Sequence, residues 1–200
     1  MTTVAGTVTT SAKSAGQQLN SVLLRVSDIT VRFGGIIALD NVSFDVRRGE
    51  IAGLIGPNGA GKTTLFNCLS RLYQWQHGSI EFEGSDLANV QRHRIAELGI
   101  GRTFQNLALF RTMSVRDNIM VGAHCRSRGG FLANSLRLPI VQREEPRVAR
   151  HAAGLINLLE LGPVAGVPAA NLPFGMQKRV ELARALAATP SLLLLDEPAA

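Results

Sequence analysis

The chain has 200 residues, with 21 Lys and Arg against 15 Asp and Glu, which gives a formal charge of +6. Its 46% hydrophobic and 18% charged residues are typical of a globular protein and exclude an intrinsically disordered chain. No run approaches the roughly 18 apolar residues of a membrane-spanning helix, and residues 1–20 lack the apolar segment of a secretory signal. Two cysteines, Cys68 and Cys125, are too few for a disulfide framework and favour a reduced, cytoplasmic chain.

The positive charge raises the possibility of nucleic-acid binding, because clustered Lys and Arg neutralise phosphates. The basic residues are mostly dispersed, however, and the densest stretch, 126–150, offsets six Arg with two Glu. We therefore interpret this stretch as a solvated or partner-facing surface and expect no nucleic-acid partner.

The first part of the chain predicts a tail followed by strands. Residues 1–20 are rich in Thr, Ser, Ala and Gly and predict a flexible tail. Alternation over 24–33 predicts a strand with an interruption at 27–28. A second alternating run, 42–46, leads through a glycine turn into 50–55. The short turn predicts that 42–46 and 50–55 pair with each other in an antiparallel layer.

The remaining segments alternate between strands and helices. Residues 51–55 are a near-continuous apolar run, which predicts a strand buried on both faces. Further strands are expected at 78–82, 100–104 and 192–195 (the last also buried), and helices at 62–72, 91–98, 175–188 and over much of 112–160. This order favours an α/β fold with parallel strands.

Residues 56–63, Gly-Pro-Asn-Gly-Ala-Gly-Lys-Thr, satisfy the pattern G-x-x-x-x-G-K-[ST] between a strand and a helix. In this motif glycines let the backbone amides surround a phosphate, and the helix N-terminus adds a favourable dipole. Lys62 reaches the β- and γ-phosphates, and the Thr63 hydroxyl ligates Mg²⁺. A plain glycine turn is the alternative, and the strand–helix context argues against it. The predicted nucleotide-binding residues here are Gly56, Pro57, Asn58, Gly59, Ala60, Gly61, Lys62, Thr63 and Thr64.

A second motif consists of four leucines, 192–195, followed by Asp196 and Glu197. A strand that ends in two acids delivers them to the carboxyl edge of the sheet, where ligands bind in open α/β folds. Asp196 is expected to hold Mg²⁺ through water, and Glu197 to polarise the attacking water as a general base. A strand end that steps into solvent is the alternative.

These motifs, in this order, resemble those of the ATP-binding cassette (ABC) ATPases, and the resemblance covers 23–200. Phe33, placed 23 residues before the glycine-rich loop, resembles the aromatic residue that stacks on adenine. Gln105, at the end of Arg-Thr-Phe-Gln, resembles the Q-loop glutamine, which implies contact with Mg²⁺ and with a membrane partner. Residues 171–177 look like the signature motif, so Gly175 is expected to contact the γ-phosphate in trans, across a dimer. Taken alone, Phe33 fits a core residue better than a stacking residue, and Gln105 is an ordinary polar residue.

The resemblance implies a P-loop NTPase fold with a parallel core sheet, an antiparallel β layer and a helical subdomain at about 106–175, within a domain that covers 21–200. Two signature positions depart from the family pattern, because Pro173 replaces a Ser and Met176 a Gln. None of the four histidines follows the two acids, where the family has a histidine that contacts the γ-phosphate. We therefore interpret the sequence as an N-terminal portion or a truncated product, and expect it to bind ATP and Mg²⁺ but to hydrolyse ATP poorly.

Within the family, the chain looks like the ATP-binding subunits of importers of branched-chain amino acids and related amides. This implies a peripheral protein at the cytoplasmic face of the membrane that couples ATP hydrolysis to uptake. The implied partners are a second ATPase subunit, identical or different, the permease subunits, which dock at 105–121, and indirectly a solute-binding protein. The alternatives are a soluble ABC ATPase that acts on nucleic acid or ribosomes and another P-loop protein such as a GTPase, whose N-K-x-D segment is absent from the sequence. The transported solute stays open.

Overall fold

The computed structural model describes residues 8–10, 21–103, 108–124 and 139–196. The chain divides into two units, Met1–Ile95 and Ala96–Ala200. Of the predicted tail, only 8–10 falls within the described residues, where it forms a short strand; the rest of the tail lies outside them.

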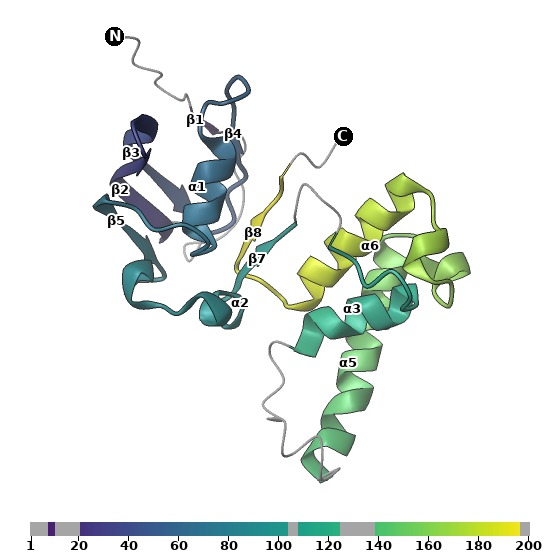
Figure 1. Ribbon diagram of the computed structural model, residues 1–200. Helices are drawn as coiled ribbons and strands as arrows, with labels where there is room; N and C mark the ends of the chain where they lie inside the picture. Colours follow the sequence, from purple (N-terminus) through teal and green to yellow (C-terminus); the bar gives the residue numbers. More distant parts are fainter. Residues whose placement is uncertain (1–7, 11–20, 104–107, 125–138, 197–200) are drawn as a thin grey trace. The chain divides into compact units, whose positions relative to one another are not determined.

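The larger sheet of the first unit is antiparallel and has four strands among the described residues (Figure 1). Its strands are β2 (Val22–Phe33), β3 (Ile36–Arg47), β5 (His77–Phe82) and β6 (Ser85–Asp86), in the order β3-β2-β5-β6. β2 and β3 form a hairpin whose turn contains Gly34 at φ 57°, a conformation that glycine adopts without strain. The predicted antiparallel layer is therefore present.

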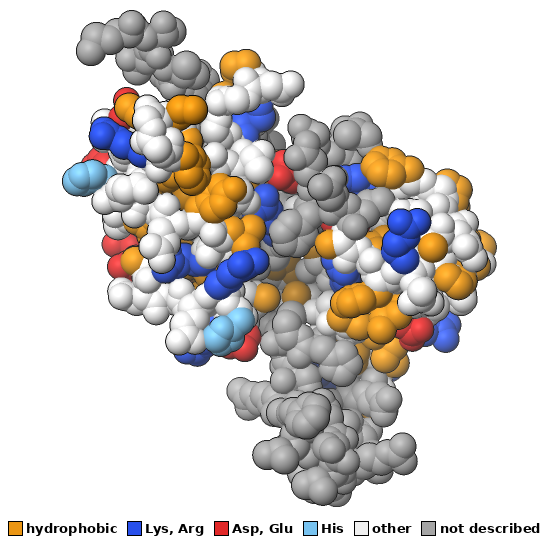
Figure 2. All heavy atoms as spheres, in the orientation of Figure 1, with side chains coloured by type: hydrophobic (Ala, Val, Ile, Leu, Met, Phe, Trp, Pro, Cys, Tyr) orange, Lys and Arg blue, Asp and Glu red, His pale blue; other side chains and the backbone are white. Residues whose placement is uncertain are grey.

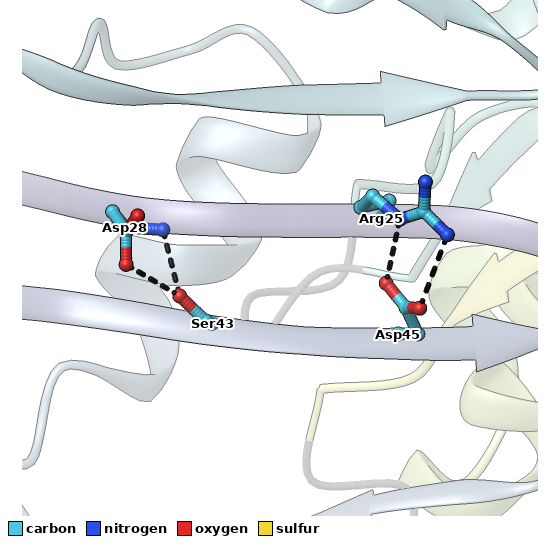
Figure 3. A network of polar contacts seen from close by, with 4 residues as sticks. All are labelled: Arg25, Asp28, Ser43 and Asp45. Carbon is cyan, nitrogen blue, oxygen red and sulfur yellow. Dashed lines mark hydrogen bonds and ion pairs between the residues drawn. The ribbon is translucent and has the colours of Figure 1, made fainter.

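The predicted interruption at 27–28 is a break in the register of β2 against β3, between Val26 and Ile29. Asp28 has a left-handed backbone, with φ at 51°. Figure 3 shows how Ser43 of β3 holds it: the Asp28 amide donates to Ser43 Oγ at 2.7 Å, and the Ser43 hydroxyl donates to Asp28 Oδ1 at 2.9 Å. The interruption is thus a locally stabilised irregularity within one strand.

The strand before the glycine-rich loop, β4 (Ala52–Leu54), pairs with β1 (Val8–Thr10) and not with β3. The prediction that 42–46 pairs with 50–55 is therefore wrong. At the end of β3 the Arg47 amide donates to Glu50 Oε2 at 2.7 Å, and the Arg48 amide donates to the Ser21 carbonyl at 3.0 Å. These bonds tie the end of β3 to its own turn and to the start of β2, so its amides are not available to a returning strand.

The prediction that 51–55 is buried on both faces is also wrong. Ile51 and Ile55 are 84% and 70% exposed, and none of the three residues of β4 between them is buried. The core of this unit is instead formed by the four-stranded sheet, by helix α1 (Lys62–Leu69) and by the 3-10 turn Leu87–Asn89 that follows β6. Its buried side chains include Leu24, Val26, Ile29, Val31, Leu65, Cys68, Leu69, Ile80, Phe82 and Leu87.

Short turns complete the first unit and lead into the second. The predicted helix at 91–98 is a 3-10 turn, Arg92–Arg94, followed by a single turn of α-helix, α2 (Ile95–Leu98). A further 3-10 turn, Leu87–Asn89, follows β6, and the carboxylate of Asp86 accepts a hydrogen bond from its Ala88 amide at 2.9 Å.

Within the part of the second unit that the structure describes, there are a pair of parallel strands and three longer helices (Figure 1). The strands are β7 (Ile100–Arg102) and β8 (Leu192–Leu194), the helices are α3 (Val115–His124), α5 (Pro139–Leu158) and α6 (Phe174–Ala187), and 3-10 turns lie at Gly162–Val164 and Ala169–Asn171. β8 is shorter and less buried than predicted, because Leu195 lies beyond it and is 39% exposed. The predicted helix at 175–188 is confirmed as α6, with Val180, Ala183 and Ala187 on its buried face.

Helices α3, α5 and α6 share one hydrophobic core. It consists of Val115, Ile119, Ala123, Ala152, Leu155, Ile156, Leu161, Ala165, Leu172, Val180, Ala183 and Ala187. Other apolar side chains of this unit remain on the visible surface (Figure 2). Among the described residues, no helix combines the length and the apolarity that crossing a bilayer requires.

Helices α3 and α6 approach each other closely at Gly122. A Cβ atom at this position would lie 2.1 Å from the Arg184 carbonyl oxygen and 2.9 Å from Arg184 Cγ. Both distances are far shorter than contacts between non-bonded heavy atoms, so the helices keep this spacing only because residue 122 has no side chain.

We predict that Gly122→Ala destabilises the chain by about 1–3 kcal/mol, the usual cost of overpacking a core. Gly154→Ala is the matched control, because Gly154 lies within α5 with no atom within 4 Å of its Cβ position. That change should stabilise by up to about 1 kcal/mol, since Ala is the better helix former. Urea denaturation followed by circular dichroism measures both effects. A Gly122→Ala chain as stable as the wild type would contradict the close approach.

Candidate functional site

The glycine-rich loop depends on a glycine whose backbone other residues rarely adopt. Gly61 has φ at 86°, and a Cβ atom there would lie 2.5 Å from the Ala38 carbonyl oxygen and 2.7 Å from Leu39 Cδ2. The end of the loop therefore packs directly on β3. Gly59, with φ at 82°, forms the second left-handed position in the loop. These two conformations turn the chain from β4 into α1 within a few residues.

Helix α1 begins without a side-chain cap. Gly61 is its N-cap residue and makes no side-chain hydrogen bond, and the first turn contains no acidic residue. The amides at a helix N-terminus lack partners within the helix and carry partial positive charge. An anion such as a phosphate can supply those partners, so this end of α1 fits the group that the sequence predicts.

Lys62 lies across the loop that precedes it. Its Nζ donates to the carbonyl oxygens of Gly56 at 2.6 Å and of Pro57 at 2.9 Å. The ammonium group thus sits beside the loop backbone, where phosphate oxygens can replace the two carbonyls. Thr63, next along the helix, is exposed. Both side chains are placed in the first turn of α1, as the motif predicts.

The buried face of α1 carries a thiol that takes no part in this chemistry. Cys68 is fully buried, and burial raises its pKa from 9.0 to about 11, although the nearby Arg71 acts in the opposite direction. The thiol therefore stays protonated at neutral pH and is no nucleophile. Its role is to pack α1 on the sheet.

Phe33 lies at the end of β2, with its ring edge-on to the ring of Tyr73. The ring centroids are 5.2 Å apart at an interplanar angle of 71°, a preferred aromatic geometry. Phe33 is 46% and Tyr73 40% exposed, so the pair offers aromatic surface to a ligand. Stacking of Phe33 on adenine stays a prediction. Sequence reasoning missed Tyr73, which no motif marks.

The two parallel strands of the second unit bring three polar side chains together at their carboxyl ends. Asp196 follows β8, while Arg102 ends β7 and Thr103 follows it. Arg102 Nη2 lies 3.3 Å from Asp196 Oδ2, and the Asp196 amide donates to Thr103 Oγ1 at 3.3 Å. Asp196 is 9% exposed, so this strand end does not step into solvent.

Sequence reasoning identified Asp196 but missed Arg102 and Thr103. The available signal was their position, since they open the Arg-Thr-Phe-Gln run of the predicted Q-loop and lie at the end of a strand that is parallel to β8. Parallel neighbours end at the same edge of a sheet, so residues after both strands meet. Gln105 and Glu197 lie outside the described residues.

The predicted signature motif forms the start of α6. Pro173 is the N-cap residue, and its carbonyl accepts the amides of Met176 at 2.9 Å and Gln177 at 3.0 Å. A proline offers no hydroxyl, so this helix also begins without a side-chain cap. No atom lies within 4 Å of the Cβ position of Gly175, and Met176 packs against the hydrophobic core instead of facing a ligand. The trans contact of Gly175 stays a prediction.

The segment 108–114, which we call the docking segment, is held by Asn118 of α3. Asn118 is fully buried, and its Oδ1 accepts the Phe110 amide at 2.9 Å. Its Nδ2 lies within hydrogen-bonding distance of three carbonyl oxygens, those of Phe110 at 3.0 Å, Met113 at 3.2 Å and Ser114 at 3.0 Å. One side chain thus fixes most of the turn. The Ser114 hydroxyl accepts the Asp117 amide at 3.1 Å and so caps the start of α3.

Arg184 of α6 fastens the other end of the docking segment. Its Nη1 donates to the Ala108 carbonyl, and its guanidinium carbon lies 6.0 Å from the centroid of the Phe110 ring. Burial lowers the pKa of Arg184, and the nearby Glu181 opposes the shift. Phe110 and Met113 are nevertheless 48% and 40% exposed, whereas Leu109 packs against the core. Leu107 lies outside the described residues.

The sequence is similar to that of proteins from one known family. A family profile described as "ABC transporter" matches residues 39–200. The chain is 40% identical, over 178 residues, to the high-affinity branched-chain amino acid transport ATP-binding protein BraF of Pseudomonas aeruginosa, and 39% identical, over 182 residues, to LivG of Escherichia coli, a protein of the same description. These alignments cover 89% and 91% of this chain and 70% and 71% of the relatives.

A solved structure agrees with the same assignment. The ADP conformation of MJ1267, an ATP-binding cassette of an ABC transporter, superposes with a TM-score of 0.73 at 32% identity. The superposition covers 90% of this chain and 70% of that one. The predicted fold class is confirmed.

We predict that Asn118→Ala increases the rate of trypsin cleavage after Arg111 at least about tenfold. The substitution leaves the backbone groups of the docking segment without their buried partner, at a cost of about 1–3 kcal/mol. Mass spectrometry of timed digests measures the rate. Cleavage after Arg150, exposed on α5, serves as the control for global opening. Equal acceleration at both sites, or none at Arg111, would contradict the specific role of Asn118.

Proposed function

Because the chain belongs to the ABC transporter family, we propose that it is the ATP-binding subunit of an importer that takes up branched-chain amino acids or related amides. The observation that carries the proposal is the uncapped start of α1, where Lys62 and two left-handed glycines form a loop suited to a phosphate chain. The choice of solute class rests on the relatives, whose descriptions name branched-chain amino acid transport.

In this proposal the first unit binds the nucleotide. The backbone amides of Gly56–Thr64 surround the phosphates, and Lys62 exchanges its bonds to the Gly56 and Pro57 carbonyls for bonds to phosphate oxygens. The exposed ring of Phe33 stacks on the adenine. An ionised donor makes a stronger hydrogen bond to a phosphate than to a carbonyl, so the exchange favours binding.

The proposed metal ligands are Thr63, Gln105 and Asp196. Among the described residues no three His, Cys, Asp or Glu side chains form a metal cluster, and Mg²⁺ that arrives with a nucleotide needs only one or two protein ligands. The exposed hydroxyl of Thr63 and the carboxylate of Asp196 fit that need. When bound, Mg²⁺ neutralises charge on the transferred phosphoryl group. Glu197 holds and polarises the attacking water, and Gln105 senses the γ-phosphate.

The proposed partners are a second ATPase subunit and the permease. Gly175, at the open start of α6, is assigned to the γ-phosphate of the second subunit's nucleotide, where the helix dipole favours negative charge. The exposed Phe110 and Met113 of the docking segment are assigned to the permease at the cytoplasmic face of the membrane, within the predicted contact region 105–121. A solute-binding protein takes part only through the permease.

We predict that Lys62→Ala weakens ATP binding about 10- to 100-fold, because one charge-assisted phosphate contact of about 1.5–3 kcal/mol is lost. Lys178→Ala is the matched control. Lys178 is also a helical lysine, but it belongs to α6 of the second unit, where it lies 5.6 Å from the centroid of the Phe174 ring. Isothermal titration calorimetry with Mg·ATP measures both. Equal affinities for the wild type and Lys62→Ala would contradict the proposed nucleotide site.

A further inference from the structure

We propose that Arg102 is a positioning residue that pairs with Asp196 in the absence of Mg²⁺ and thereby lowers the affinity of the site for that cation. The proposal rests on the proposed function, in which Asp196 is a metal ligand. Arg102 is the first residue of the Arg-Thr-Phe-Gln run that ends at Gln105, and no role was assigned to it above. Its effect is exerted through the carboxylate with which it pairs.

The ion pair is buried on both sides. Arg102 Nη2 and Asp196 Oδ2 are 3.3 Å apart, and the two side chains are 8% and 11% exposed. By contrast, the pair between Arg179 and Glu160 has almost the same separation, 3.4 Å, with side chains 52% and 82% exposed. Charges that are withheld from water interact strongly and are poorly screened by salt, whereas an exposed pair contributes little. The guanidinium is therefore an effective counter-charge for Asp196.

The backbone holds both partners at this distance. Arg102 is in register with Leu194 in the parallel ladder, and the Thr103 amide donates to the Leu194 carbonyl at 3.0 Å. The Asp196 amide in turn donates to Thr103 Oγ1. These contacts place residues 102 and 196 at adjacent strand ends. An incoming divalent cation thus meets a carboxylate that already faces a fixed positive charge.

Two consequences follow for this carboxylate. Without Mg²⁺, the guanidinium compensates a buried negative charge that would otherwise be costly. When Mg²⁺ binds, its attraction to Asp196 is offset by repulsion from Arg102, since both are cations at one carboxylate. Arg102 thus lowers the affinity for Mg²⁺ and stabilises the buried carboxylate of Asp196 in the metal-free state. Nucleotide affinity without metal should not depend on it.

The test is a Mg²⁺ titration of the full 200-residue chain saturated with a fluorescent ADP analogue, N-methylanthraniloyl-ADP. We expect Arg102→Gln to lower the half-saturating Mg²⁺ concentration about tenfold, which corresponds to about 1.4 kcal/mol. Arg102→Lys keeps the charge and should restore the wild-type value. Arg179→Gln removes the exposed arginine and should change nothing. Affinity for the analogue in EDTA should be equal in all four chains.

A second measurement applies if Arg102→Gln weakens the fold. Thermal unfolding of each ADP-saturated chain is compared in EDTA and in Mg²⁺, so that each chain is its own reference. The stabilisation by Mg²⁺ should be larger in Arg102→Gln than in the wild type. An equal or smaller gain overturns the proposal.

Asp196→Asn separates this inference from the proposed function. If Asp196→Asn weakens Mg²⁺ binding while Arg102→Gln has no effect, the role of Arg102 is wrong and that of Asp196 stands. If Asp196→Asn leaves the Mg²⁺ titration unchanged, the proposed metal ligand is wrong and the inference falls with it. A shift in Arg102→Lys as large as in Arg102→Gln would also overturn the inference, because charge would not be the cause.

Discussion

The polar contacts among Arg102, Thr103 and Asp196 depend on one constraint, the parallel pairing of β7 with β8. These strands are three residues long and far apart in sequence, yet their register decides which side chains meet beyond their ends. With Ile100 opposite Leu192, the residues that follow both strands project from the same edge. Asp196 therefore receives its charge partner from one neighbour and a backbone bond from the next. A shift of one residue would turn these side chains to the opposite face of the sheet.

Both units rely on the absence of a side chain at a close backbone contact. In the first unit, Gly61 lets the end of the glycine-rich loop rest against the β3 backbone. In the second, Gly122 lets α3 rest against the α6 backbone. The first contact sets where α1 begins, and so where its free amides point. The second sets where Arg184 leaves α6, from which it reaches the docking segment. Two residues without side chains thus position the start of α1 and the arginine that holds the docking segment.

The sequence predicted those parts whose physics is local. The loop at 56–63 carries its own glycines and lysine, and the face of α6 follows from the spacing of its apolar residues. Predictions failed where the outcome depended on a competing partner. Ile51 looked buried by composition alone, but burial depends on what covers a strand. The predicted pairing of 50–55 with 42–46 also failed, because the Glu50 carboxylate accepts the Arg47 amide, which is then not available to a new strand. Composition does not specify such long-range choices.

The pair of Arg102 and Asp196 is another long-range contact that composition does not specify. Each residue is visible in the sequence, but 94 positions separate them and only the strand register joins them. Asn118 is a similar case, since nothing in its local sequence announces a buried amide with bonds to a turn. Such side chains are found only once the backbone that surrounds them is known.

Asn118 also limits which side chains its position can accept. The site presents one amide that Asn118 accepts and three carbonyls within reach of its Nδ2, each of which also accepts a backbone amide. Aspartate is acceptor-only when ionised, serine has a single donor, and glutamine is one methylene too long for the same geometry. Of the twenty amino acids, asparagine alone matches this set in both length and polarity. Because it carries no ionisable group, its own bonds to the turn do not depend on a protonation state of its side chain.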